Sequence, residues 1–166
     1  MLNSTSLAAP GYGEPTEESS TALATATGAE NLPRVSRRLP RLDVVRIHWL
    51  LRIACAGEFI GHGAFGLITK AGWLPYFGVV GIPPSVAYQL MPMIGLVDIS
   101  VGLLVLVRPV RAALLYMALW GLATATIRPL SGEPIWEWVE RFPNFCVPFA
   151  FLYLRGFGKS LADWQR

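Results

Sequence analysis

The sequence has few charged residues and few of the side chains that carry most enzyme chemistry. Only 15% of its 166 residues are Asp, Glu, Lys or Arg, and it has two histidines and two cysteines. Soluble domains carry about 25% charged residues. The shortfall, with 53% hydrophobic residues and a mean hydropathy of +0.44, favours a membrane protein. The net charge of +3 comes from basic residues between apolar runs, which argues against nucleic acid as a partner.

The chain also lacks the short motifs that hold common cofactors. It has no phosphate-binding loop, dinucleotide fingerprint, nucleophile elbow, C-x-x-C pair or zinc motif. Glu58, His62 and Asp98 could bind a metal by type, but Glu-x-x-x-His occurs once and differs from the Glu-x-x-His of di-metal bundles, so no metal is predicted. Cys55 and Cys146 lie in apolar runs and are interpreted as buried free thiols, although similar expected depths leave a redox pair open.

Two polar segments precede the apolar part of the chain. Residues 1–33 are rich in Ser, Thr, Ala, Gly, Pro and Glu, which cannot bury a core, so they are predicted to form a disordered tail. This tail has neither the basic start nor the apolar stretch of a signal peptide. Residues 34–43 form a basic juxtamembrane segment, which we interpret as a topology signal, with binding of anionic lipid as the alternative.

Residues 44–157 are predicted to be an all-α integral membrane domain, a four-helix up-and-down bundle. A spanning helix needs about 20 mostly apolar residues, and the predicted spans are 44–69, 86–107, 110–127 and 135–154. Gly57-x-x-x-Gly61 offers a small-residue face for packing in the first span. Residues 158–166 form a C-terminal tail. Lys and Arg predominate on the side that holds both termini, so both are predicted to be cytoplasmic.

The first predicted span carries polar side chains that a lipid-facing helix would exclude. His48, Arg52, Cys55 and His62 fall on one stripe of a helix, with Glu58 at its edge. A charge facing lipid at mid-depth costs about 2.5–3.5 kcal/mol or more. This stripe is therefore predicted to face other protein or a water-filled cavity.

Helical depth predicts two groups of partners inside the bundle. At a rise of about 1.5 Å per residue, Arg52 lies level with Asp98, which predicts an inner ion pair. Glu58, His62 and Arg128 are predicted to form an outer polar cluster, with Glu133, Glu137 and Glu140 at its mouth. Glu58 and His62 are four residues apart and suit a proton relay or a quinone headgroup site, with a structural clasp as the alternative.

Several of these residues resemble a known family. Glu58-Phe-Ile-Gly-His62-Gly, Asp98, and Arg128-Pro129 followed by Gly132-Glu133 resemble the DoxX-like integral membrane proteins of bacteria. The resemblance implies four spans in the inner membrane. It also implies a role as the membrane subunit of a quinone-linked redox complex, because one branch is the small subunit of a thiosulfate:quinone oxidoreductase and others belong to redox stress complexes.

The expected partners are therefore the lipid bilayer and a membrane or redox protein, and quinone is the expected ligand. Whether the chain is itself an enzyme is left open. The alternative function is a non-enzymatic one, as a small transporter or as a structural, partner-binding membrane protein.

Overall fold

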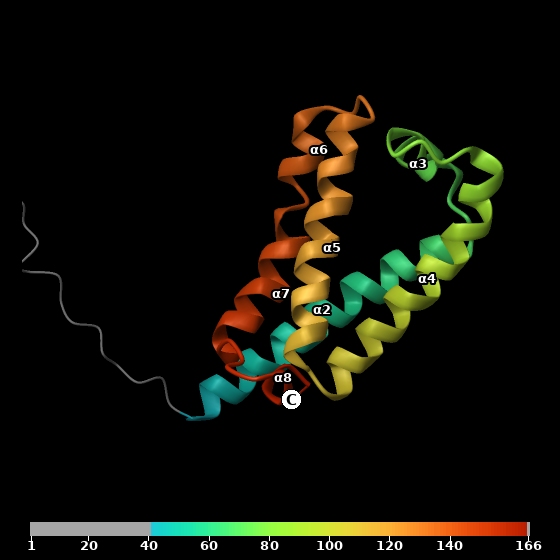
Figure 1. Ribbon diagram of the computed structural model, residues 1–166. Coiled ribbons are helices and arrows are strands. Elements are labelled where there is room, and N and C mark those ends of the chain that lie inside the picture. Colours follow the sequence, from blue (N-terminus) through green and yellow to red (C-terminus); the bar gives the residue numbers. More distant parts are fainter. Residues whose placement is uncertain (1–40, 166) are drawn as a thin grey trace, which may run out of the picture. The chain divides into compact units, whose positions relative to one another are not determined.

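The computed structural model describes residues 41–165, and its helices belong to one compact unit, residues 39–166 (Figure 1). The described part contains no strand, which confirms the predicted all-α class. The predicted tail, residues 1–33, and residues 34–40 of the basic segment lie outside the described residues. In chain order the elements are α2 (Arg41–Leu67), η2 (Ala71–Trp73), α3 (Leu74–Val79), α4 (Pro84–Val107), α5 (Arg111–Leu130), α6 (Ile135–Val139), α7 (Phe142–Arg155) and α8 (Leu161–Trp164).

Two of the described helices, α4 and α5, are long and apolar enough to cross a membrane. A third candidate span combines α2 with the short η2–α3 segment, which turns from it by 101°. The large apolar side chains that these helices expose, such as Leu50, Leu96 and Leu119, suit contact with lipid. The described helices are thus compatible with insertion in a membrane.

The observed helix bounds differ from the predicted ones at two prolines. Pro129 predicts that the third span stops at Arg128, yet α5 continues to Leu130, and the Ser131 amide donates to the Ile127 carbonyl to close the last turn. Where the sequence predicts one helix over 135–154, the structure has two, α6 and α7. Pro143 lies in the first turn of α7, where a missing amide hydrogen costs least, and so favours a new helix at this point.

The helices pack as two pairs, α2 with α4 and α5 with α7, and α2 also touches α7. Glycines let the backbones of each pair approach closely. A Cβ atom on Gly63 would lie 2.5 Å from the Gly95 carbonyl oxygen, and one on Gly121 would lie 2.7 Å from the Asn144 carbonyl oxygen. Gly57 has nothing within 4 Å of a built Cβ, nor has Gly61, so the Gly57-x-x-x-Gly61 face is not the one that packs in the described fold.

A buried apolar cluster joins the two pairs near the α4–α5 turn. It draws on α2, α4, α5 and α7, and its members include Cys55, Phe59, Val105, Leu114, Met117, Phe151 and Leu152. Burying such side chains contributes about 1.5–3 kcal/mol each relative to exposure in water. The cluster holds the pairs together at one end, and the candidate site lies toward the other end, where α3 and α6 are found (Figure 1).

Arg111 ties the start of α5 to the end of α7. Its guanidinium donates to the carbonyl oxygens of Arg155 at 3.0 Å, Gly156 at 2.7 Å and Asp163 at 2.8 Å. Ser160 caps the following helix, α8, and its hydroxyl and amide donate to the Asp163 carboxylate at 2.9 and 3.0 Å. These hydrogen bonds lower the pKa of Asp163 below its usual range.

We expect Gly63→Ala to destabilise the folded protein by about 1–3 kcal/mol, because the new methyl group would overlap the backbone of α4. Gly57→Ala on the same helix is the control, since its methyl group would enter open space. The measurement is thermal unfolding of the two purified variants in one detergent. Equal melting temperatures would show that α2 and α4 do not touch at this point.

Candidate functional site

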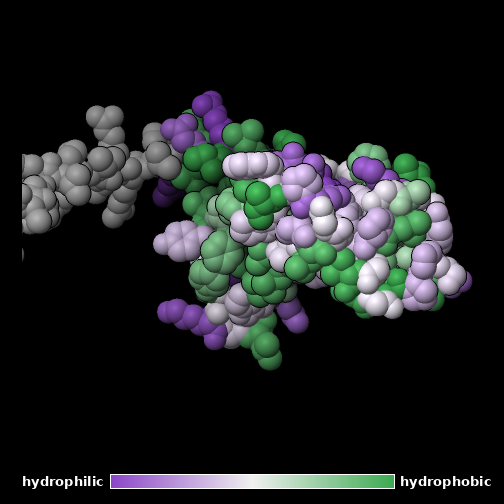
Figure 2. Space-filling model, turned by 90° about the horizontal axis from the view of Figure 1, so that it is seen from above, coloured by the Kyte–Doolittle hydropathy of each residue, from purple (hydrophilic) through white to green (hydrophobic). Residues whose placement is uncertain are grey.

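A cavity of about 380 Å³ lies between the two helix pairs. Its walls are mostly apolar, and side chains from α2, α3, α4, α5 and α7 line it. Figure 2, which looks onto the α3 and α6 end, shows hydrophilic and weakly polar residues gathered at this end. The polar lining residues are Glu58, His62, Tyr76, Asp98, Thr124, Arg128, Arg141 and Asn144, and the indoles of Trp73 and Trp120 also face the cavity.

The structure joins Glu58 and His62, as their spacing predicts. The His62 Nδ1 atom lies 2.9 Å from the Glu58 Oε1 atom, and Nε2 lies 3.5 Å from an Arg141 Nη1 atom. An arginine can only donate, so Nε2 is assigned as the acceptor and Nδ1 as the protonated nitrogen that donates to Glu58. The imidazole also stacks on the Trp73 indole, with centroids 5.8 Å apart and planes 17° apart. These contacts hold the ring in one orientation at the cavity wall.

Arg128 is held by acids of the α5–α6 connection and of α6. Its Nη1 atom lies 2.9 Å from Glu133 Oε2 and 3.1 Å from Glu137 Oε2, so these two predicted mouth residues do reach it. The expected link from Arg128 to Glu58 or His62 is not formed in the described structure, where Arg141 takes the place beside His62. Glu133 and Glu137 follow Arg128 closely in sequence, so bringing them together costs little chain entropy.

A hydrogen bond closes the mouth of the cavity between the two helix pairs. The Tyr76 hydroxyl on α3 donates to Glu133 Oε1, and the Arg128 guanidinium lies over the Tyr76 ring, 5.3 Å from its centroid. Because α3 belongs to the α2–α4 connection and Glu133 to the α5–α6 connection, this bond links segments distant in sequence. Glu140 remains half out in solvent and lies 3.2 Å from Arg141 Nε.

The predicted inner pair, Arg52 with Asp98, is not formed. Asp98 is 5% exposed and accepts a hydrogen bond from the Trp120 side chain, while its Oδ1 atom has no partner. The Arg52 guanidinium lies 4.8 Å from the centre of the Trp49 ring, and no ion pair joins it to a described acid. The prediction aligned the ends of the helices, but their glycine contacts stagger α4 along α2.

The register of that contact explains the difference. Gly63 faces Gly95, so Asp98 falls at the level of His62, and both residues line the cavity. Arg52 lies ten residues earlier on α2 than His62, which is about 15 Å along the helix axis. In the structure Asp98 therefore belongs to the outer cluster with Glu58 and His62, and not to the predicted inner pair.

The two cysteines differ in exposure. Cys55 is buried, as interpreted, whereas Cys146 is exposed, so the interpretation of Cys146 as buried is wrong; both are free thiols, and the structure does not pair them. Within residues 41–165, no three His, Cys, Asp or Glu side chains gather closely enough to hold a metal ion.

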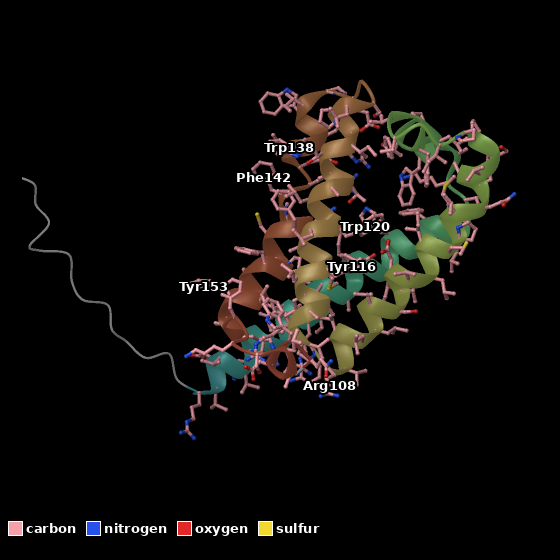
Figure 3. All side chains as sticks on the ribbon, viewed as in Figure 1. Arg108, Tyr116, Trp120, Trp138, Phe142 and Tyr153 are labelled. Atoms are coloured by element: carbon pink, nitrogen blue, oxygen red, sulfur yellow. The ribbon has the colours of Figure 1, made fainter. Side chains whose placement is uncertain are left out.

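Six polar or indole-bearing cavity residues were not among the predicted site residues, namely Trp73, Tyr76, Trp120, Thr124, Arg141 and Asn144. Trp120 precedes Thr124 and Arg128 at intervals of four, so helical spacing could have placed it on the stripe that faces the cavity. Figure 3 shows Trp120 on the side of α5 that faces α2 and α4, and Trp138, Phe142 and Tyr153 on the far side of α6 and α7. No comparable spacing in the sequence indicated that Arg141 and Asn144 face the cavity, because the break between α6 and α7 decides which way these side chains point.

Comparisons with protein-family models, with curated proteins and with solved structures find no match to this chain.

Removing the hydroxyl that closes the mouth should loosen the two helix pairs. We expect Tyr76→Phe to lower stability by about 1 kcal/mol, in the range of a net hydrogen bond, because the Glu133 carboxylate loses a donor. Tyr153→Phe is the control, since that side chain is 72% exposed. Unfolding in detergent measures both, and a double-mutant cycle with Glu133→Gln should show a coupling that additive losses would disprove.

Proposed function

We propose that this chain is a multi-pass protein of the bacterial inner membrane whose cavity binds the headgroup of a quinone. In this proposal α2, α4, α5 and the α6–α7 segment form a four-helix up-and-down bundle that crosses the bilayer, with a disordered N-terminal tail and both termini cytoplasmic. The apolar helices α4 and α5 support insertion. The many Lys and Arg residues near the α4–α5 turn and the C-terminus support this orientation.

The observation that carries the proposal is a cavity with apolar walls and hydrogen-bonding groups of both kinds. Its volume of about 380 Å³ lies in the range of about 300–1,000 Å³ that suits small-molecule sites. Arg141 and Asn144 can donate to a quinone carbonyl oxygen. Asp98, with its unpartnered oxygen, can accept a hydrogen bond from the hydroxyl of the reduced quinol.

The same residues suggest how protons could accompany the reduction of a quinone. Each two-electron reduction also takes up two protons at the quinone oxygens. His62 is hydrogen-bonded to Glu58, and together they lie on the cavity wall toward its mouth. An imidazole ring can accept a proton at one nitrogen and donate a proton from the other, so this pair is placed to pass protons while a redox partner protein supplies the electrons.

The resemblance to DoxX-like proteins supports the same assignment. Four of the residues that carry it, Glu58, His62, Asp98 and Arg128, line the one cavity. In this proposal the chain acts as the membrane subunit of a redox complex. Loss of thiosulfate- or thiol-driven quinone reduction in membranes that lack the protein would support that role, and unchanged activity would contradict it.

A steric block should test quinone binding while keeping Arg141, Asn144 and Asp98, the residues proposed to hydrogen-bond the headgroup. Thr124→Phe would place a bulky ring in the cavity, whereas Thr126→Phe on the same helix is the control, since Thr126 does not line it. We expect Thr124→Phe to weaken binding of a short-tailed quinone by at least about tenfold, or about 1.4 kcal/mol. Quenching of tryptophan fluorescence measures binding, and equal affinities would rule out this cavity as the site.

The proposed topology has its own test. Reporter fusions after Glu30, Pro109 and Arg166 should give cytoplasmic signals, and fusions after Val80 and Gly132 should give external ones. An external signal after Arg166 would show that the α6–α7 segment does not cross the membrane.

One observation favours a second function, that of a small proton-coupled transporter. Asp98 is a buried acid without a cationic partner among the described residues, and such intramembrane acids often carry protons in transporters. In proteoliposomes, a solute flux driven by a proton gradient and lost in Asp98→Asn would favour this function over quinone binding.

A further inference from the structure

The apolar lining of the cavity is concentrated on one side of it. Because α2 pairs with α4, α5 pairs with α7, and α2 also touches α7, the cavity has one side formed by α2 and α7 and another formed by α4 and α5. On the first side, α2 and the start of α7 provide the polar residues Glu58, His62, Arg141 and Asn144. On the second side, α3, α4 and α5 provide a set of apolar residues that we call the apolar face, namely Phe77, Leu90, Ile94, Ala123 and Ile127.

Helical spacing shows how the apolar face runs through the bundle. Asp98, Ile94 and Leu90 follow one another at intervals of four along α4, so they share one side of that helix. Leu90 lies about 12 Å from Asp98 along the helix axis, toward the end where α3 is found. On α5, Ala123 follows Trp120, whose side chain donates a hydrogen bond to Asp98. The apolar face therefore begins beside the buried acid and continues toward the α3 end.

Polar groups on both sides of the cavity meet at the inner end of the apolar face. The backbone of Asn144 packs on Gly121, which directly follows Trp120, the residue that contacts Asp98. Asn144 and Asp98 therefore lie at about the same depth, on opposite sides of the cavity. Asp98 is 5% exposed and its Oδ1 atom has no partner, so this level suits a ligand group that forms hydrogen bonds.

The apolar face reaches the surface between α4 and α5. These helices diverge from the short turn that joins them (Figure 1), and Ala123 both lines the cavity and is exposed. The neighbouring side chains Met93 and Leu122 are exposed and apolar, and they suit contact with acyl chains. The mouth of the cavity is instead closed by the hydrogen bond from Tyr76 to Glu133. The opening between α4 and α5 thus leads to lipid in the proposed membrane.

We propose that the apolar face binds the isoprenoid tail of the quinone, which extends from the headgroup between α4 and α5 into the acyl chains of the bilayer. An isoprenoid chain forms no hydrogen bonds and is held by dispersion contacts, which aliphatic side chains such as Leu90 and Ile94 provide. The ligand then enters sideways from the bilayer. This inference rests on the proposed quinone function and adds the part of the ligand that reaches the lipid.

The charges of the cavity favour a quinone over a phospholipid as the owner of that chain. Both lining arginines already have carboxylate partners, since Arg128 pairs with Glu133 and Arg141 pairs with Glu140. A phosphate in the cavity would also lie close to the buried Asp98 carboxyl group, and like charges repel strongly where water is excluded. A quinone headgroup is neutral and avoids both costs.

The test separates the tail from the headgroup with two probes. The purified full-length protein is given a benzoquinone without a tail, or the same benzoquinone with a short isoprenoid tail, and quenching of tryptophan fluorescence gives each dissociation constant. We expect Ala123→Phe, which places a ring in the opening, to weaken binding of the tailed quinone about tenfold. Its affinity for the tail-less quinone should stay within about twofold of the wild type. The tail partitions equally into detergent with each protein, so that effect cancels between them.

Leu122→Phe is the matched control, because Leu122 is the preceding residue on α5, is 40% exposed and does not line the cavity. It should bind both probes as the wild type does. Equal losses for the two probes in Ala123→Phe, or no loss for either, would overturn the tail site and leave the quinone function standing. Displacement of both probes from the wild type by phosphatidylcholine would assign the cavity to a phospholipid. A wild type that binds neither probe would contradict the quinone function itself, and the tail site with it.

Discussion

The backbone contact between α2 and α4 is the constraint on which the rest of the site depends. At Gly63 and Gly95 the two helices approach so closely that neither position has room for a Cβ atom. That contact sets the stagger of the pair, and the stagger brings Asp98 level with His62. A side chain at either glycine would force the helices apart, and the dispersion contacts and the shared cavity wall would be lost together.

A second glycine contact does the same for α5 and α7. Gly121 lies against the Asn144 backbone, and the register that follows places Arg128 beside Glu137 at one end and Arg111 beside Arg155 at the other. One contact therefore sets which groups meet at both ends of this helix pair.

The cavity combines features that are useful only when they occur together. An apolar wall admits a hydrophobic ring, while Arg141 and Asn144 can donate and Asp98 can accept hydrogen bonds. The hydrogen bond from Tyr76 to Glu133 closes the mouth across two connections.

The sequence alone determined the class of the fold and the kind of residue in the site. Its apolar runs predict the positions of α2, α4 and α5 closely, because a helix in lipid must satisfy its own backbone over a fixed thickness. The polar stripe with Glu58 and His62 was also evident, because charges in an apolar helix must face inward. Helical spacing also puts Gly121, Thr124 and Arg128 on one face of α5, and all three line the cavity.

Only the tertiary structure decided which of these residues meet. Counting depth from the helix ends predicted that Arg52 pairs with Asp98, but the stagger set by the contact of Gly63 with Gly95 keeps the two residues apart. Likewise, the break between α6 and α7 brought Arg141 to His62, where the sequence had suggested Arg128. Hydropathy and periodicity describe each helix by itself, whereas the register between helices depends on small contacts far apart in the chain.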